Sequence, residues 1–374
     1  MNVAGGAPAR KARGLVEGLG GRAHFCFEAG TRETIRSGHF AGGCGEAVER
    51  FARWWGDDES IDAIGHRVVH GGAKFSDATV LDRKAWRELE RLNELAPLHN
   101  PPALEGIRAA RRIFGRKKKM VAVFDTAFHR TIPDFAAHYA LPWRVVRKYG
   151  LRRFGFHGLA HESMLRGFAR LSGETVARAK LITLQLGSGC SITAIRHGKS
   201  VDTSMGFTPL EGLMMGTRSG DIDPSLVSFL ASREKVSAGE VEDWLNKESG
   251  LLGVSGLSAD IREILAARPS NARAALALEI FCYRARKYIG SYFAALNGVD
   301  AIVFGGGMGE HRPEVRRGIC AALDGLGVRL DSRRNRACRE SEGRISATGS
   351  RVKVYVVRVD EAALIAEKTA RVLG

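Results

Sequence analysis

The segment 181-LITLQLGSGCSITAIR-196 decides the class of fold. Two apolar runs, residues 181–186 and 191–196, flank the turn Gly187-Ser188-Gly189, and this pattern predicts a β-hairpin. A third strand is expected after the turn at His197-Gly198. Because glycine allows backbone N–H groups to approach an anion closely, the first turn is also a candidate phosphate-binding loop.

Outward from this hairpin, short apolar strands alternate with amphipathic helices. Apolar runs typical of strands lie at residues 61–64, 120–124, 301–304 and 352–357. Apolar residues recur at helical spacing in residues 83–95, 105–114, 224–245, 272–296, 313–326 and 361–372. The helix at 105–114 is expected to begin only after Pro101-Pro102, and a glycine loop is expected after the strand at 301–304. The alternation predicts an α/β fold in two halves, divided between residues 125 and 142.

The composition is that of an ordinary globular protein. Of the 374 residues, 44% are hydrophobic, 26% are charged and 45 are glycine, which excludes a disordered, collagen-like or disulfide-scaffold protein and fits two domains. No apolar stretch approaches the ~20 residues of a membrane span, and residues 1–13 lack the apolar core of a signal peptide. The six cysteines form no CxxC pair. They are therefore expected to be reduced thiols, which favours a cytoplasmic protein.

The chain is basic, with 57 lysine and arginine residues, 41 acidic residues and a formal net charge of +16. Such a charge can attract nucleic acid, an anionic membrane or small anionic substrates. The densest basic run, residues 111–119, is interpreted as a solvated helix end and loop. Its single aromatic residue, Phe114, is not the platform of several aromatic residues that RNA stacking requires, and the chain shows no zinc-finger or RNP pattern. We therefore expect neither nucleic acid nor a membrane as a partner.

Two further features point to an anionic ligand. A second glycine-rich turn, 304-FGGGMGE-310, also follows an apolar strand, although neither turn matches the P-loop or the dinucleotide fingerprint. Arg67 in 66-HRVVHGG-72 and Arg218 in 216-GTRSGDIDP-224 each lie in a glycine-bounded segment that can present a side chain to a cleft. Arginine binds carboxylate and phosphate groups through two parallel hydrogen bonds. The alternative interpretation is a pair of surface arginines that hydrogen-bond their own loops.

Taken together, these segments resemble the acetate kinase family. The motifs that carry the resemblance occur in order between about Leu15 and the C-terminus: 66-HRVVHGG-72, 95-LAPLHNPP-102, 123-VFDTAFH-129, 153-RFGFHG-158, 207-FTPLEGL-213, 216-GTRSGDIDP-224, 258-SADIR-262 and 306-GGMGE-310. The resemblance implies an α/β protein of two actin-like (ribonuclease H-like) domains that close over a nucleotide cleft. Residues 1–130 with 361–374 would form an acetate-binding domain, and residues 131–360 would form a nucleotide-binding domain.

The resemblance also implies a reaction. ATP and acetate, or another short-chain carboxylate, would react reversibly to give ADP and acetyl phosphate by direct in-line transfer. Mg²⁺ would be the cofactor, with Mn²⁺ as a possible substitute, and ATP the co-substrate. The protein would form a homodimer.

For the carboxylate substrate, the resemblance assigns Arg67 to the carboxylate group. Val69, Leu98 and Pro209 would shape a small apolar pocket for the methyl group. The chemistry is reasonable, since a guanidinium matches the planar carboxylate and an apolar wall suits a methyl group.

For the transfer step, the resemblance assigns Arg218 and His157 to stabilising charge on the phosphoryl group, and Asp125 as the catalytic carboxylate. Positioning and electrostatics do most of the work in phosphoryl transfer. A carboxylic acid substrate is already ionised at about pH 7. Asp125 is therefore better suited to orienting magnesium or the substrate than to removing a proton.

For the nucleotide and its metal ion, the resemblance implies residues from three segments. The ATP-binding residues would be Gln185, Leu186, Gly187, Ser188, Gly189, Asp260, Ile261, Arg262, Gly307, Met308, Gly309, Glu310 and His311. Glu361 matches the family's magnesium-binding glutamate. Among these, Asp260, Arg262 and the 307–311 loop would hold the adenosine and its ribose.

Several positions depart from the family pattern. Gln185 and Ser188 stand where the family usually has histidine and asparagine, and His311 and Ala362 replace an asparagine and the second of two glutamates. The family's N-terminal hairpin, with its Asn-x-Gly-Ser-Ser-Ser turn, has no counterpart in residues 1–13, which is expected to leave an apolar sheet edge unpaired. These departures leave an alternative function: a weakly active or non-catalytic actin-like relative that binds a nucleotide or a carboxylate as a sensor.

Overall fold

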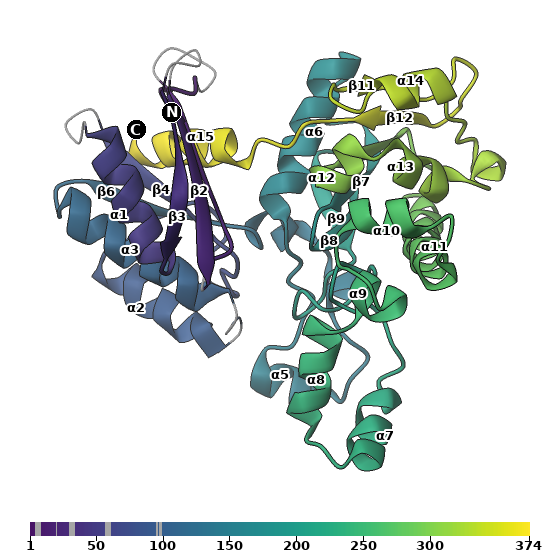
Figure 1. The fold of residues 1–374 in the computed structure, drawn as a ribbon, viewed down its shortest axis with the longest axis horizontal. Helices are drawn as coiled ribbons and strands as arrows, with labels where there is room; N and C mark the ends of the chain where they lie inside the picture. The colour runs from purple at the N-terminus through teal and green to yellow at the C-terminus, as the bar shows by residue number, and fades with distance from the viewer. Residues whose placement is uncertain (4–8, 20, 30–33, 57–60, 95, 97–98) are drawn as a thin grey trace. The chain divides into compact units, whose positions relative to one another are not determined.

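The computed structural model describes residues 1–3, 9–19, 21–29, 34–56, 61–94, 96 and 99–374. Over these residues the chain divides into two compact units (Figure 1). The first unit comprises Met1–Ala127 with Asp360–Gly374, and the second comprises Phe128–Val359. No helix in the described part of the chain is long and apolar enough to cross a membrane.

The first unit contains a three-stranded sheet in the order β4-β6-β5, formed by β4 (Ala63–Val68), β6 (Lys119–Phe124) and β5 (Thr79–Val80). β4 and β6 run parallel and pair over their whole length, whereas β5 is antiparallel to β6. The carboxyl ends of β4 and β6 therefore meet at one edge of the sheet. That edge places Arg67, near the end of β4, beside Asp125, which directly follows β6.

Among the described residues of the first unit, four α-helices accompany the strands. They are α1 (Cys44–Trp55), α2 (Arg83–Arg91), α3 (Asn100–Phe114) and the C-terminal α15 (Glu361–Leu373). The apolar core under them includes Val68, Leu89, Leu104, Ile107 and Phe124. α15 packs closely on β4, because a Cβ atom on Gly65 would lie only 2.3 Å from Oγ1 of Thr369. This close packing is possible only at a residue without a side chain, and it fixes the position of α15 on the sheet.

α3 begins earlier than the sequence analysis predicts. It starts at Asn100, with Pro101 and Pro102 in its first turn. Proline is tolerated there because the first N–H groups of a helix have no acceptor within the helix. The expectation that this helix begins only after the two prolines is therefore wrong.

The N-terminal part of the first unit forms a second sheet, an antiparallel meander of β1 (Ala12–Glu17), β2 (Arg22–Ala29) and β3 (Thr34–Ala41). The aromatic side chains that pack between this sheet and α1 are Phe25, Phe27, Phe40, Phe51 and Trp54. The outer strand β1 is mostly exposed and carries the charged residues Arg13 and Glu17. Charged side chains therefore interrupt the apolar residues along the β1 edge of this sheet.

The second unit contains a six-stranded sheet in the order β11-β12-β10-β7-β8-β9. Its strands are β7 (Lys180–Leu186), β8 (Cys190–Arg196), β9 (Lys199–Thr203), β10 (Ala301–Gly305), β11 (Gly343–Arg344) and β12 (Lys353–Val356). β7, β8 and β9 are successively antiparallel, while β10 runs parallel to both β7 and β12. The predicted hairpin and the predicted third strand are confirmed by β7, β8 and β9.

Two long helices contact the sheet of the second unit (Figure 1). α6 (Gly158–Ser172) packs its buried apolar residues against β7, β10 and β12, and α11 (Ala272–Ala295) contacts β7 and β8. The shorter helices are α4 (Asp134–Ala137), α5 (Trp143–Tyr149), α7 (Ser225–Glu234), α8 (Ala238–Lys247), α9 (Gly250–Ser255), α10 (Ile261–Ala267), α12 (Gly306–His311), α13 (Pro313–Cys320) and α14 (Ser332–Ala337). Turns of 3-10 helix lie at Leu92–Glu94, Ala127–Thr131 and Asp324–Leu326.

The single helix predicted at residues 224–245 is in fact two helices, α7 and α8. Lys235 adopts a left-handed φ of 58°, which ends α7. Ser237 then begins α8 in a capping box, because its side chain accepts the N–H of Glu240 while the Glu240 side chain accepts the N–H of Ser237. The Ser-x-x-Glu signal for this second start is present in the sequence.

The expectation of a glycine loop after β10 is also wrong, because these residues form the short helix α12 (Gly306–His311). Its first N–H group, on Gly306, donates to Oε1 of Glu310 at 3.0 Å. Its last carbonyls, on Gly309 and Glu310, accept from Nη1 of Arg316 at 2.7 and 2.8 Å. Side chains at both ends thus stabilise a helix that glycine alone disfavours.

Candidate active site

The turn between β7 and β8 brings three predicted site residues together in the second unit. Gly187 donates its backbone N–H to the carbonyl of Gly189 at 3.1 Å, which closes the turn. A Cβ atom on Gly189 would lie 3.4 Å from Nη1 of Arg218 and 3.4 Å from Nε2 of His157. The guanidinium and the imidazole therefore reach the same point beside a glycine turn, which is an arrangement suited to an anion.

Arg218 is held at this point by its own loop. Gly216 donates its N–H to the carbonyl of Ser188 at 3.1 Å and thereby ties the loop to the turn. Nη1 of Arg218 donates to the carbonyl of Pro209 at 3.3 Å. No carboxylate in the described part of the chain pairs with this guanidinium, and its burial lowers its pKa. A partly buried cation without an acidic partner is stabilised by an anionic ligand.

His157 is placed by the start of α6. It is the N-cap residue of this helix and has a left-handed φ of 57°. A non-glycine residue in this region is uncommon and often marks a functional site. Nδ1 of its ring lies 2.9 Å from Oγ of Ser191 on β8. This contact fixes the ring so that Nε2 faces Gly189.

In the first unit, Arg67 joins two acidic residues for which the sequence predicts different roles. Nε of Arg67 donates to both carboxylate oxygens of Asp125, at 3.2 and 3.1 Å, and Nη2 donates to Oδ2 at 2.7 Å. Nη1 lies 3.3 Å from Oε2 of Glu361, the first residue of α15. The side chain of Asp125 is 1% exposed and that of Arg67 is 38% exposed. One guanidinium thus links the predicted catalytic carboxylate to the predicted metal ligand.

The charges in this cluster perturb one another. The carboxylate of Asp125, more than that of Glu361, holds the pKa of Arg67 above its usual value. Burial, together with the nearby charge of Asp125, raises the pKa of Glu361 although Arg67 acts in the opposite direction. Two carboxylates and one guanidinium therefore leave an excess of negative charge at this sheet edge.

The carboxylate pair fits a hard divalent cation. Such an ion prefers oxygen ligands and in nucleotide enzymes takes one or two carboxylates, water and phosphate oxygens. Asp125 and Glu361 supply two carboxylates with uncompensated negative charge. Over the described ranges, no group of three or more His, Cys, Asp or Glu side chains could hold a metal ion. A cation here would therefore need oxygen ligands from a substrate or from water.

The residues predicted to surround the substrate methyl group are only partly described. Val69 is half-buried immediately after β4 in the first unit, and Pro209 is half-buried in a loop of the second unit. Leu98 lies outside the described residues. The apolar pocket for the methyl group therefore stays a prediction.

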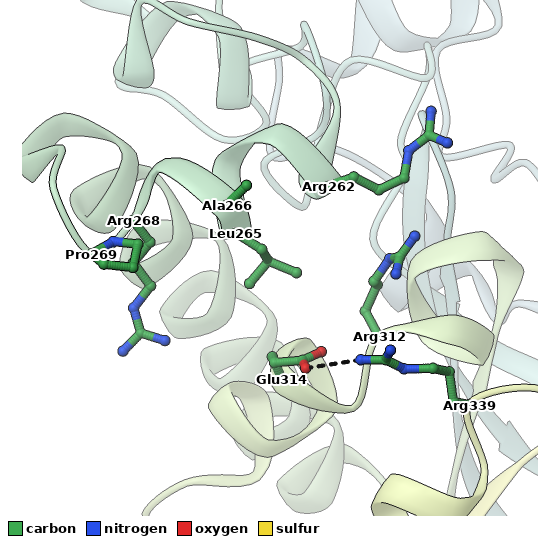
Figure 2. A pocket seen from close by; sticks show the side chains of 8 residues that line it. All are labelled: Arg262, Leu265, Ala266, Arg268, Pro269, Arg312, Glu314 and Arg339. Carbon is green, nitrogen blue, oxygen red and sulfur yellow. Dashed lines mark hydrogen bonds and ion pairs between the residues drawn. The ribbon is translucent and has the colours of Figure 1, made fainter.

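A cavity of about 680 Å³ opens beside α10 in the second unit (Figure 2). Its lining residues are Arg262, Leu265, Ala266, Arg268, Pro269, Arg312, Glu314 and Arg339. Figure 2 shows Leu265 directed towards the middle of this set and an ion pair, 3.3 Å long, between Glu314 and Arg339. Arg262 belongs to the predicted ATP-binding residues. The others lie outside the recognised motifs, and no pattern in the sequence marks them.

The remaining predicted ATP-binding residues lie at three places in the same unit. At the start of α10, Asp260 caps the helix and accepts a 2.8 Å hydrogen bond from Nε of Arg262. At the end of β7, the Gln185 amide lies against Gly306, where a Cβ atom would be 2.8 Å from Nε2 of Gln185. Oε1 of Gln185 is buried and has no hydrogen-bond partner among the described residues.

The predicted residues on α12 are engaged in holding that helix. Oε1 of Glu310 accepts N–H groups from Gly306 at 3.0 Å and from Val359 at 3.1 Å. Nδ1 of His311 lies 2.8 Å from the carbonyl of Arg339, a residue that lines the cavity. The side chains of Leu186, Ile261 and Met308 are buried. Such buried residues can act on a nucleotide through their backbone and through the shape they give to the site.

Comparison with known proteins decides the family. The model of the acetokinase family matches residues 24–367. The chain belongs to the acetokinase family. Its relatives include the acetate kinase of Heliobacterium modesticaldum, which is 50% identical over 84% of this chain and 78% of the relative. The acetate kinase of Solibacter usitatus is 43% identical over 98% of this chain and 91% of the relative.

Solved structures of the acetokinase family agree with this fold. The crystal structure of Porphyromonas gingivalis acetate kinase has a TM-score of 0.89 and 40% identity, and the match covers 97% of this chain and 94% of that chain. A propionate kinase from Francisella tularensis has a TM-score of 0.88 and 38% identity, covering 96% and 92%. The predicted resemblance, the α/β fold of actin-like domains and the phosphotransferase class are therefore confirmed.

Proposed function

We propose that this acetokinase-family protein transfers the γ-phosphoryl group of ATP reversibly to acetate, giving ADP and acetyl phosphate. The observation that carries the proposal is the convergence of Arg218 and Nε2 of His157 beside Gly189. In phosphoryl transfer, charge is spread over the oxygens of the moving group, and positioned donors stabilise it. An acetate oxygen forms the new P–O bond as the bond to the ADP oxygen breaks in line with it.

Arg67 is the proposed ligand of the acetate carboxylate. Asp125 and Glu361 hold its guanidinium in a fixed orientation, and 38% of its side chain stays exposed. A pre-oriented guanidinium loses little conformational entropy when it binds a carboxylate. Val69, Leu98 and Pro209 are the proposed neighbours of the methyl group. The propionate kinase relative makes propionate the first alternative substrate to compare.

Asp125 and Glu361 are the proposed ligands of Mg²⁺, for which Mn²⁺ could substitute. When bound with ATP, the ion supplies positive charge to the phosphate oxygens. No proton has to be removed from acetate, because a carboxylic acid is already ionised at about pH 7. Asp125 therefore acts by orienting Arg67 and the ion.

The adenosine of ATP is proposed to enter the cavity beside α10, where Arg262 and Arg312 contribute donors and Leu265 contributes an apolar wall. The phosphates would then reach the Gly187–Gly189 turn, whose backbone can approach them closely. Cavity, turn and α12 all belong to the second unit. This makes the second unit the proposed nucleotide-binding domain and the first unit the proposed acetate-binding domain.

We place the protein in the cytoplasm as a homodimer. All six cysteines are free thiols, which suits a reducing compartment. α7 buries none of its residues and exposes the apolar side chains of Leu226 and Phe229. Apolar side chains exposed on one face of a helix can contribute to a protein–protein contact.

An assay for acetyl phosphate tests the function. The purified chain is mixed with ATP, MgCl₂ and acetate, and both ADP and acetyl phosphate are measured against time. We expect equal amounts of the two products and no ADP formation when acetate is left out. A protein that binds ATP by calorimetry but forms no acetyl phosphate would support the alternative role as a sensor. Parallel assays with propionate and butyrate define the carboxylate preference.

A further inference from the structure

Behind His157, a chain of four side chains runs into the core of the second unit. Nδ1 of His157 lies 2.9 Å from Oγ of Ser191, and Nε2 of His161 lies 2.8 Å from the same oxygen. Nδ1 of His161 lies 2.7 Å from Oγ1 of Thr183. Ser191, His161 and Thr183 are fully buried, on β8, α6 and β7 respectively.

The hydrogen bonds in this chain have a direction. Within the described ranges, Oγ1 of Thr183 has no hydrogen-bond partner other than His161. The buried O–H group of Thr183 can therefore form a hydrogen bond only by donating to Nδ1 of His161. Burial, and to a lesser degree the neighbouring His129 and His157, lower the pKa of His161 far below its usual value. His161 is therefore neutral and carries its single proton on Nε2.

The same order of donors and acceptors extends from His161 through Ser191 to His157. Nε2–H of His161 donates to Oγ of Ser191, and the Ser191 hydroxyl is then left to donate its own proton to Nδ1 of His157. Because Nδ1 of His157 accepts this proton, a neutral His157 must carry its proton on Nε2. Nε2 is the ring nitrogen that would lie 3.4 Å from a Cβ atom on Gly189, the same distance as Nη1 of Arg218.

We propose that Thr183, His161 and Ser191 are positioning residues that hold His157 in its Nε2–H tautomer. The role rests on the proposed function, because the N–H of His157 would then donate to an oxygen of the transferring phosphoryl group. In the other tautomer, Nε2 would present a lone pair to an anionic oxygen and repel it. The hydrogen bonds from Thr183 to His157 thus keep the neutral imidazole of His157 as a hydrogen-bond donor at the site.

The tautomer can be measured without the reaction. Full-length protein with ¹⁵N-labelled histidine is examined by long-range ¹H–¹⁵N correlation spectroscopy at about pH 8.5, two units above the ordinary imidazole pKa. His157→Asn identifies the signals of His157. We expect the Nε2–H form in the wild type and in Thr183→Ser, and a mixture of both tautomers in Thr183→Val and Ser191→Ala. A His157 that is Nδ1–H in the wild type, or unchanged in both altered proteins, overturns the proposal.

Ser200→Ala is a matched control for these variants. Oγ of Ser200 is buried and lies 2.9 Å from Nδ1 of His129, so this pair is a serine–histidine hydrogen bond outside the chain. Its loss should leave the tautomer of His157 as in the wild type. A tautomer shift in Ser200→Ala equal to that in Ser191→Ala would mean that the effect is general loosening of the unit, which also overturns the proposal.

Kinetics provide the second measurement. Ser191→Ala should lower kcat in proportion to the fraction of His157 that leaves the Nε2–H form, about twofold for an equal mixture of tautomers, with the KM values for acetate and ATP little changed. Thr183→Ser should restore most of the activity that Thr183→Val loses. If the wild type makes no acetyl phosphate but the tautomer shifts occur, the proposed function is wrong and the positioning role of Thr183, His161 and Ser191 is supported. If the wild type is active but the tautomer of His157 does not change in Thr183→Val and Ser191→Ala, only the positioning role is wrong.

Discussion

Arg67 stabilises the first unit and is also the proposed contact for acetate. Replacing Arg67 with alanine removes the guanidinium shared by Asp125 and Glu361. We expect the KM for acetate to rise one to two orders of magnitude, which corresponds to about 1.5–3 kcal/mol for a hydrogen bond to a charged group. We also expect a lower melting temperature, because Asp125 is left buried and unpaired. Initial rates against acetate concentration and a thermal melt measure the two effects.

Arg371→Ala is the matched control for Arg67→Ala. Arg371 also donates to a carboxylate in the first unit, that of Asp77 at 2.8 Å, but both side chains are exposed. Exposed pairs contribute about 0–1 kcal/mol, so this variant should keep its acetate KM and nearly its melting temperature. An active Arg67→Ala enzyme with an unchanged acetate KM would show that Arg67 does not bind the substrate.

Gly189 marks the point on which His157 and Arg218 converge. Its φ is not in the left-handed region, and an added Cβ atom would make contacts of 3.4 Å, which are ordinary. Gly189→Ala should therefore fold normally while its methyl group occupies space that the phosphoryl group needs. We expect kcat to fall at least about tenfold, since small misplacements at a reacting group can cost about a hundredfold.

The control for Gly189→Ala is Gly349→Ala. Gly349 is another loop glycine of the second unit, and nothing lies within 4 Å of a Cβ atom added there. Both variants should melt close to the wild type. Full activity in Gly189→Ala would place the transferring group away from this turn, and the proposed site would have to be moved.

At the scale of elements, the C-terminal end of α12 is held by one buried side chain. Arg316 is fully buried and donates five hydrogen bonds of 2.7 to 2.9 Å to carbonyl and amide oxygens, including the carbonyls of Gly309 and Glu310. Burial lowers its pKa to about 10. Arg316 thus completes the end of the helix on which the proposed adenosine contacts lie.

Arg316→Lys should weaken nucleotide binding selectively. A lysine has three donors on one nitrogen and cannot reach all five acceptors that the guanidinium fork reaches. Losing one or two such bonds predicts a rise in the ATP KM of about tenfold, with the acetate KM unchanged. Titration calorimetry with ADP provides an independent affinity.

Arg286→Lys is the control at the element scale. Arg286 likewise donates to carbonyls at the end of a helix, those of Gly318 at 2.7 Å and Ile319 at 3.3 Å on α13. That helix end carries none of the proposed nucleotide contacts. Equal losses of ATP affinity in the two lysine variants would mean that α12 has no special role in binding.

At the scale of the whole molecule, several large apolar side chains on α4, α5 and α7 of the second unit are exposed. Phe135, Trp143, Leu226 and Phe229 are 87%, 58%, 43% and 54% exposed. Figure 1 shows α5, α7 and α8 extending away from the six-stranded sheet of that unit. A specific interface buries about 1,200–2,000 Å², and apolar side chains at its centre supply most of its stability. We therefore propose α7, which carries Leu226 and Phe229, as the contact between two copies of the chain.

Phe229→Glu should convert the proposed dimer to a monomer, because a buried carboxylate without a partner strongly opposes association. Size-exclusion chromatography with light scattering measures the mass, and circular dichroism checks that the fold is kept. Leu15→Glu is the control, since Leu15 is 45% exposed but lies on β1 in the first unit. A wild-type monomer, or a Phe229→Glu protein that stays dimeric, would contradict the proposed interface.

Local patterns in the chain were enough to predict the elements nearest the site. The β7–β8 hairpin follows from two apolar runs around Gly187-Ser188-Gly189, because period and turn chemistry act between close neighbours in sequence. The motifs around Arg67, Asp125 and Arg218 likewise predict the family that the comparisons confirm. The errors also have local causes: prolines that open α3 instead of preceding it, and glycines that form α12 because the nearby side chains of Glu310 and Arg316 satisfy its ends.

The contacts between these elements depend on the fold. Arg67 meets Asp125 because β4 and β6 are parallel and in register, and it meets Glu361 because Gly65 lets α15 pack closely on β4. No spacing in the chain reveals the cavity beside α10 or the hydrogen-bonded path from His157 to Thr183. Buried polar groups must find partners wherever packing brings them, so these partnerships are fixed only when strands and helices far apart in the chain are assembled.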